Sequence, residues 1–296
     1  MLYRFNKSNV NTQKGNFSYF FKGYTNNIKG KNMAEKNLIE TLCEKIIDSD
    51  IESVKKMIAK GIDLNTKNEA GNSPLCCASN AEMAELLLEN GADINSTDED
   101  GFTLLSHACF VGNVEIIDTL VKHGADVNAK DKNGLISLHA TKDLKTIKYL
   151  LEHGANINEK DNTEWTPLYW AMILGANVDV IEFLLENGAD ANAKTDEGDT
   201  VLHRTTDMEI AKTLIKHGAN VNIQDNNDAT PLHYSAYSGG LENVKFLIAN
   251  GADINIKDKD GDTPLDAAKR KLADKDLTDE ARKNLQAIID YLKSVK

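Results

Sequence analysis

The sequence predicts an all-α fold in which about eight short helix-turn-helix units stack in a line as a solenoid. The first observation behind this prediction is a glycine that recurs every 30 to 34 residues along most of the chain. A period of this size is typical of stacked arrays, in which each unit packs only against its neighbours. These glycines stand at positions 61, 91, 124, 154, 188, 218 and 251.

The second observation is a helix-start signal at the beginning of the later units. In four of them a hydroxyl residue precedes proline, as in Thr230-Pro231. The hydroxyl oxygen can accept a hydrogen bond from a backbone N–H of the first turn, and proline at the first helical position lacks a donor that would have no partner there. All four prolines of the chain, at positions 74, 167, 231 and 264, follow Ser or Thr in this way.

The third observation is the pattern of the second helix in each unit. Apolar residues recur at helical spacing, as at Val244, Leu247 and Ile248, and the pattern stops at the recurring glycine. Glycine adopts the left-handed conformation that ends a helix. Lysine or histidine often precedes it, where a positive side chain is favourable at the negative end of the helix dipole: Lys60, His123, His153 and His217.

These signals divide the chain into a basic, Asn/Lys-rich segment, residues 1–32, and a repeat domain, residues 33–296. The repeat units are expected at about 36–65, 66–95, 96–128, 129–158, 159–192, 193–222, 223–255 and 256–296. The last unit ends in an amphipathic helix capped by Thr278, which we expect to close the stack and keep its end soluble.

Short and long units alternate, because three units lack about three residues between their paired helices. The shortening falls at 79–81, 141–143 and 206–208. The long units carry an apolar pair at this level, Phe110-Val111 and Ile173-Leu174. We expect these pairs to cover the missing turn of the neighbouring unit; the alternative is a groove for a partner.

Charge and composition limit the function. Residues 1–32 contain six cations and no Asp or Glu, which leaves a net charge of −18 on the remainder. Such a surface repels phosphate backbones, so we expect no nucleic-acid binding by the repeat domain. Four cysteines do not make a disulfide framework in a chain of 296 residues and favour a reducing compartment. No apolar run could span a bilayer and no signal peptide is recognisable, which predicts a soluble cytoplasmic protein.

Three interpretations of residues 1–32 remain open. The segment shows no helical or strand period, which favours a disordered tail. Translation could instead begin at Met33, where the composition changes abruptly. Aromatic residues beside Lys22 would also suit a segment that adheres to a membrane surface or to a partner.

Motifs of known catalytic sites do not occur in the sequence: there is no Gly-rich phosphate loop, Gly-x-Ser-x-Gly, His-Glu-x-x-His or Cys-x-x-Cys. The nearest set to a metal site is Cys76, Cys77, His107, Cys109 and His139. These residues lie on successive units about 8–10 Å apart, too far for all of them to converge on one zinc ion. We therefore expect no enzymatic activity, no cofactor and no metal.

Thr-Pro-Leu-His at 230–233, Gly-Ala-Asp-Ile-Asn at 251–255 and Asp-Gly-Asp-Thr-Pro-Leu at 260–265 resemble ankyrin repeats. The similarity covers about 36–296. It implies an antiparallel helix pair in each unit, a hairpin-like loop at each junction, and a concave face of loop tips and first helices that binds other proteins. It also implies structural hydrogen bonds for His139, His203 and His233.

The resemblance places the variable positions at the loop tip before the Thr position and at the residue after the His position. Large aromatic residues and arginine are common in interface hot spots. We predict a protein-binding site formed by Phe102, His107, Leu135, Trp165, Trp170, Arg204 and Tyr234, with Phe102, Leu135 and Trp165 exposed at the tips. Acidic tips beside them favour a basic partner: Glu99, Asp100, Asp196, Glu197, Asp260 and Asp262. The alternative is that the aromatic side chains pack on neighbouring loops.

The sequence thus predicts a monomeric, non-enzymatic scaffold or adaptor that binds a protein partner. The alternative is a protein directed to membranes or nucleic acid by residues 1–32. Heavy use of Asn, Lys and Ile suggests an AT-rich genome, and ankyrin-like proteins of intracellular microbes often act on host proteins. The expected location is therefore the cytoplasm, either of the producing cell or of a host cell after export without a cleavable signal peptide.

Overall fold

The computed structural model describes residues 33–295, with side chains described from residue 38. The three interpretations of residues 1–32 lie outside this part of the chain. The described part is all-α, and its strand pairing is confined to one isolated bridge between Thr97 and Thr103. A boundary between Asn162 and Thr163 divides it into two compact units. The predicted all-α repeat fold is confirmed.

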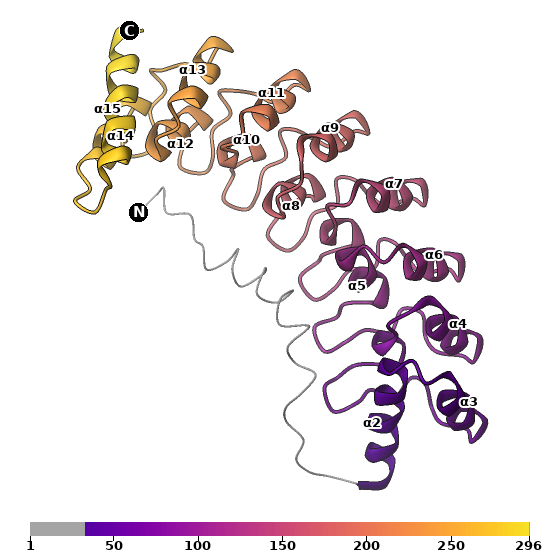
Figure 1. Cartoon of the computed structure of the whole chain (residues 1–296). Coiled ribbons are helices and arrows are strands. Elements are labelled where there is room, and N and C mark those ends of the chain that lie inside the picture. Colours follow the sequence, from indigo (N-terminus) through magenta and orange to yellow (C-terminus); the bar gives the residue numbers. More distant parts are fainter. Residues whose placement is uncertain (1–32, 296) are drawn as a thin grey trace. The chain divides into compact units, whose positions relative to one another are not determined.

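The unit that ends at Asn162 contains four helix pairs (Figure 1). Their elements are α2 (Met33–Ile47) with α3 (Ile51–Ala59), η2 (Leu75–Cys77) with α4 (Ala81–Glu89), α5 (Leu104–Val111) with α6 (Val114–Lys122), and η3 (Ser137–Ala140) with α7 (Leu144–Glu152). The first elements of these pairs form one row, in which α5 contacts both η2 and η3. Among the second elements, α4 contacts α6. Each apolar stripe is therefore covered by the next repeat.

The unit that begins at Thr163 is built in the same way (Figure 1). Its elements are α8 (Pro167–Ile173) with α9 (Val178–Glu186), α10 (Val201–Arg204) with α11 (Met208–Lys216), α12 (Pro231–Ser238) with α13 (Leu241–Ala249), and α14 (Pro264–Leu272) with α15 (Asp279–Ser294). Of the helices in the described part of the chain, none combines the length and the apolar character needed to cross a bilayer.

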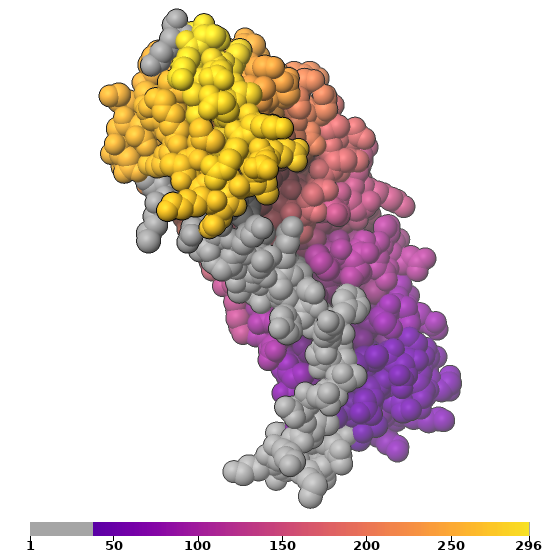
Figure 2. Space-filling view, turned by 60° about the vertical axis from the view of Figure 1, so that its left-hand side comes forward, coloured from indigo at the N-terminus to yellow at the C-terminus, as the bar shows by residue number. Residues whose placement is uncertain are grey.

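The C-terminal helix α15 closes its unit, as the sequence predicts. It contacts α12, α13 and α14. Its apolar stripe is buried against them: Leu285, Ile288, Ile289 and Leu292. Its opposite side faces solvent at the yellow end of the chain (Figure 2).

The shortened repeats differ from the expected helix pair. Their first helix is reduced to about one turn in η2, η3 and α10, whereas α5, α8, α12 and α14 have seven to nine residues. In the short repeat at η2, the backbone becomes extended at Ala78, where ψ is 125°, and α4 begins three residues later. The missing residues are thus those of the second turn of the first helix. The helix pairs of these three repeats therefore have a first helix of about one turn.

The start and end signals of the helices act as predicted. Thr166 Oγ accepts a hydrogen bond from the backbone N–H of Tyr169 at the start of α8. At the helix ends, Nδ1 of His123, His153 and His217 donates to the carbonyl oxygen four residues earlier, at 2.8–2.9 Å. In other repeats the same position is asparagine, and its side-chain amide makes the same bond, as in Asn187 to Phe183.

The histidines at 139, 203 and 233 make the structural hydrogen bonds that the resemblance implies. In His233, Nδ1 accepts from the backbone N–H of Thr230 at 3.1 Å, and Nε2 donates to the carbonyl oxygen of Asp262 at 3.1 Å. His203 and His139 repeat this geometry. Each ring is neutral, with its proton on Nε2, and each ties one helix start to a later loop. Burial lowers the pKa of His203 to about 4, which keeps this ring in the neutral form.

Candidate protein-binding site

Four of the loops between repeats are held in shape by an aspartate near the start of the tip. In Asp98, Oδ1 accepts from the backbone N–H groups of Asp100 and Phe102, both at 2.9 Å. Asp131, Asp225 and Asp258 make the same pair of bonds. A short acidic side chain that binds its own backbone stabilises a tight turn. The tips therefore have a defined conformation before any partner arrives.

In two of these aspartates, Asp98 and Asp225, the second oxygen binds the first helix of the same repeat. Asp98 Oδ2 lies 3.0 Å from Nε2 of His107, nine residues later, and the Phe102 and His107 rings are 5.5 Å apart. The same spacing joins Asp225 to the hydroxyl of Tyr234 at 2.8 Å. Two of the predicted site residues thus link a loop to a helix.

Arg204 lies in a polar cluster of the unit that begins at Thr163. Its Nε donates to Oδ2 of Asp199, and its Nη2 donates to Glu197 at 2.7 Å. Asp199 also accepts from the hydroxyl of Tyr169 at 2.9 Å. The guanidinium carbon lies 5.3 Å from the centre of the Tyr234 ring. Asp199 is 1% exposed, so its charge needs these partners.

The two tryptophans form one aromatic group with Tyr169. The Trp165 ring lies 4.7 Å from Tyr169 and 5.5 Å from Trp170, measured between ring centres. Trp170 is 1% exposed and belongs to the core, whereas Trp165 is half-buried. Of this pair, only Trp165 presents part of its ring to solvent.

The prediction that Phe102 and Leu135 are exposed at loop tips is wrong, since they are 4% and 5% exposed. Both precede a helix start and lie at the base of the loop, where their backbone N–H is bound by the loop aspartate. The loops also stack closely. A Cβ atom at Gly101 would lie 2.9 Å from the backbone nitrogen of Lys132 in the next loop.

The predicted residues fall into separate groups. In the unit that ends at Asn162, Phe102 contacts His107, and Leu135 is buried at the next loop. In the unit that begins at Thr163, Trp165 contacts Trp170, and Arg204 contacts Tyr234. His107, Arg204 and Tyr234 are partly buried and already hydrogen-bonded. The alternative, packing on neighbouring residues, therefore describes most of these side chains. Whether they contact a partner stays a prediction.

Several tip residues are acidic. Glu99, Asp100, Asp196, Glu197 and Asp260 are exposed, and Asp262 is half-buried beside Arg270 at 2.8 Å. An exposed apolar pair lies at the end of α5, where Phe110 is 38% and Val111 54% exposed. The equivalent pair, Ile173 and Leu174, is half-buried. That these pairs cover the missing turn of the neighbouring repeat stays a prediction.

The Cys and His set, for which the sequence predicts no metal site, is not among the converging ligand groups of the described residues, and the pKa of each of its thiols is raised. Burial raises the pKa of Cys76 to about 11. Among the described residues, the metal-type side chains that converge are Glu182, Glu186 and His217. Sequence reasoning missed them because they lie on the second helices of two successive repeats. The same order of acid, acid and histidine also occurs at Glu85, Glu89 and His123, which do not converge, so the sequence pattern alone does not single out this group.

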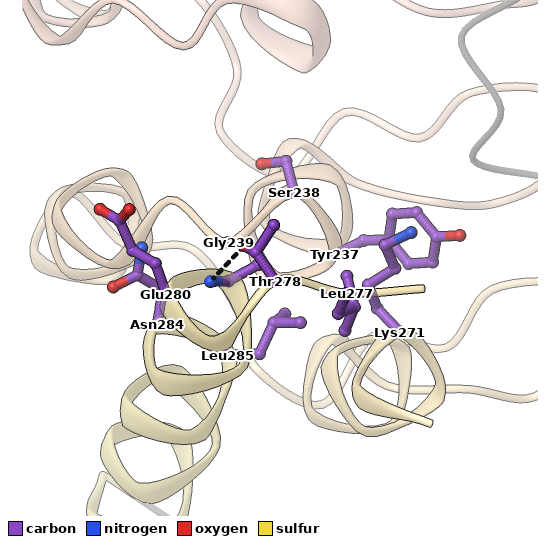
Figure 3. Close-up of a pocket in the computed structure, with 10 residues that line it drawn as sticks. Tyr237, Ser238, Gly239, Lys271, Leu277, Thr278, Glu280, Asn284 and Leu285 are labelled. Carbon is purple, nitrogen blue, oxygen red and sulfur yellow. Dashed lines mark hydrogen bonds between the residues drawn. The ribbon is translucent and has the colours of Figure 1, made fainter. Parts of the chain in front are cut away.

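A small open pocket of about 240 Å³ lies between α12, α14 and α15 (Figure 3). Lys271 Nζ lies 5.3 Å from the centre of the Tyr237 ring, and the Thr278 hydroxyl caps α15 by accepting from Ala281. The pocket is smaller than most small-molecule sites, which occupy about 300–1,000 Å³. Its small volume argues against a ligand site.

Comparison with known proteins agrees with this architecture. A family model described as ankyrin repeats, three copies, matches residues 42–131, 130–195 and 177–258. A segment of 64 residues is 41% identical to potassium channel AKT1 of Oryza sativa, in both subspecies indica and japonica. The match covers 21% of this chain and only 7% of the channel's length.

Proposed function

Because the chain belongs to the ankyrin-repeat family, we propose that it is a non-enzymatic adaptor that binds a protein partner with its loop tips and first helices. The observation that carries this proposal is the double use of the loop aspartates. One oxygen fixes the loop backbone and the other binds the first helix, as in Asp98 and Asp225. A surface held in this way binds a partner without first losing loop entropy.

Charge supports a basic partner. The exposed tip residues Glu99, Asp100, Asp196 and Glu197 are all acidic, and residues 33–296 carry a net charge of −18. Charges at the rim of an interface act mainly on the association rate, and salt screens them. Binding should therefore weaken as the salt concentration rises.

Each unit also offers apolar contact area of its own. In the first unit this area is the exposed pair Phe110 and Val111, and in the second it is the half-buried ring of Trp165. Apolar and aromatic side chains next to an acidic rim suit a partner segment in which basic and apolar residues alternate.

Site-specific photocrosslinking in cell lysate tests the proposal with the full chain. A photoreactive phenylalanine replaces Asp100 or Asp196 at the tips, or Glu115 or Glu209, which are exposed on second helices, as controls. We expect crosslinks to basic proteins from the tips alone, and fewer of them at high salt. Equal crosslinking from the second helices, or partners without basic segments, would overturn the proposal.

The same material tests the predicted monomeric state. Light scattering of the purified chain should give the mass of one copy, 32.6 kDa, at micromolar concentration. A dimer that dissociates when the tip charges are reversed would assign the tips to self-association instead of a foreign partner.

A further inference from the structure

Three side chains that can ligate a metal ion lie close together at the second helices of the unit that begins at Thr163: Glu182, Glu186 and His217. One carboxylate oxygen from each glutamate and one ring nitrogen of His217 all lie within 4.8 Å of one another. The glutamates are one helical turn apart on α9, and His217 follows the end of α11, which contacts α9. Glu186 is exposed and the other two are half-buried, so ions reach the group from solvent.

A hydrogen bond outside the group prepares the imidazole for a cation. His217 Nδ1 lies 2.9 Å from the carbonyl oxygen of Thr213. A carbonyl oxygen only accepts, so Nδ1 carries the proton of the neutral ring and Nε2 carries a lone pair. A histidine that binds a metal usually donates its other ring N–H to a carbonyl or carboxylate in this manner, which fixes the tautomer and the orientation of the ring.

The chain contains an internal comparison 64 residues earlier. The equivalent positions hold Asp118, Lys122 and His153, and His153 makes the same bond to a carbonyl oxygen, that of Tyr149. There, Lys122 neutralises Asp118 at 2.6 Å. Replacement of that lysine by Glu186 turns an ion pair into two adjacent carboxylates beside an imidazole.

A positive charge, that of Lys216, lies next to the group formed by Glu182, Glu186 and His217. Its Nζ lies 2.7 Å from Oε1 of Glu182, and its side chain is 66% exposed. An exposed ion pair of this kind contributes little to stability, because both groups are well solvated when apart. Lys216 therefore competes only weakly with a divalent ion for Glu182.

We propose that Glu182, Glu186 and Nε2 of His217 bind one Zn²⁺ ion and thereby join α9 to α11. Zinc accepts mixed imidazole and carboxylate ligands at about 2.0–2.2 Å, whereas magnesium and calcium prefer oxygen ligands alone. Three protein ligands leave a fourth position for water or for a side chain of a partner. Tetrahedral zinc ligands lie about 3.3–3.6 Å apart, so the glutamate side chains need to close from their present separation of up to 4.8 Å.

Calorimetric titration of the full chain with ZnCl₂, under a reductant that does not bind metal, tests the site. H217N is the sharpest variant, because asparagine at the equivalent position of α9, Asn187, keeps the helix-end hydrogen bond. We expect one zinc ion per chain, and a loss of affinity of at least about tenfold in H217N and in E186K. K216M should bind zinc more tightly, since it removes the competing cation.

Two further variants separate this site from unspecific binding. H153N removes the histidine of the equivalent group, in which Lys122 pairs with Asp118. H123N removes a histidine whose equivalent glutamates, Glu85 and Glu89, do not converge on it. Both should bind zinc like the unaltered chain, and the long-range nitrogen NMR signal of His217 Nε2 should shift on addition of zinc. Unchanged affinity in H217N, equal losses in H153N or H123N, or no measurable binding would overturn the proposal.

Discussion

The hydroxyl of Tyr234 donates a 2.8 Å hydrogen bond to Oδ2 of Asp225, whose Oδ1 accepts two backbone N–H groups of its own loop. One buried carboxylate therefore fixes both the shape of a loop and its attachment to α12. For Asp98, Asp131 and Asp225, the residue nine positions later decides whether this attachment exists. This rule accounts for His107 as well, and it leads to specific expectations.

Removal of the Tyr234 hydroxyl should destabilise the protein. In Y234F the buried Oδ2 of Asp225 loses a donor, and an unsatisfied buried group costs about 1–3 kcal/mol. Urea unfolding followed by circular dichroism gives the change in the free energy of unfolding. Y291F is the control, because the hydroxyl of Tyr291 makes no hydrogen bond within the described residues. Equal stability of the two variants would contradict the expectation.

Replacement of Asp131 by asparagine should stabilise the protein, because the second carboxylate oxygen of Asp131 is buried without a hydrogen-bond partner among the described residues. The residue nine positions later is Ala140, which has no donor. Burial raises the pKa of Asp131 to about 6, so its contribution to stability is lost as the pH rises from about 4 through 6.

D131N should therefore stabilise the protein by about 1–2 kcal/mol at pH 7 and by little at pH 4. Asn68 already holds the first loop by the same backbone bond, at 2.9 Å, so asparagine is compatible with this position. Urea unfolding at both pH values measures the difference. A destabilised D131N, or an equal gain at both pH values, would show that Oδ2 has a partner.

His203 should make the fold sensitive to acid. Its pKa is lowered by burial from 6.5 to about 4, so stability is complete above about pH 6.5 and falls as the pH drops toward 4. The neutral ring is required because Nδ1 accepts from the backbone N–H of Thr200. In H203N this part of the pH dependence should disappear, although the variant is less stable at pH 7. The free energy of unfolding of both proteins is measured at pH 7, 6 and 5. Subtracting one protein's values from the other's cancels the contribution of the carboxylates that titrate in both.

The two tryptophans should respond differently to alanine. W170A removes a core side chain and should cost about 3–5 kcal/mol, whereas W165A removes a half-buried ring and should cost less. Both tryptophans belong to the predicted binding site, but the burial of Trp170 makes its replacement a change in the core. Thermal unfolding separates the two variants, and photocrosslinking from Asp196 in the W165A background tests whether Trp165 contributes to partner binding.

The sequence determined the repeat period, the helix starts at Thr230 and its equivalents, the helix ends before glycine and the structural role of His233. These features depend on bonds within one repeat or between neighbours in a fixed register, so residue type and spacing are sufficient to predict them.

Only the tertiary structure decided which side chains are exposed and which side chains lie next to one another. Phe102 and Trp170 occupy variable positions, but stacking of the next loop or helix buries them, and burial depends on atoms tens of residues away in the chain. The meeting of Glu182 and Glu186 with His217 has the same origin. The packing of α9 on α11 sets their distance, and a one-dimensional pattern carries no information about that packing beyond the period itself.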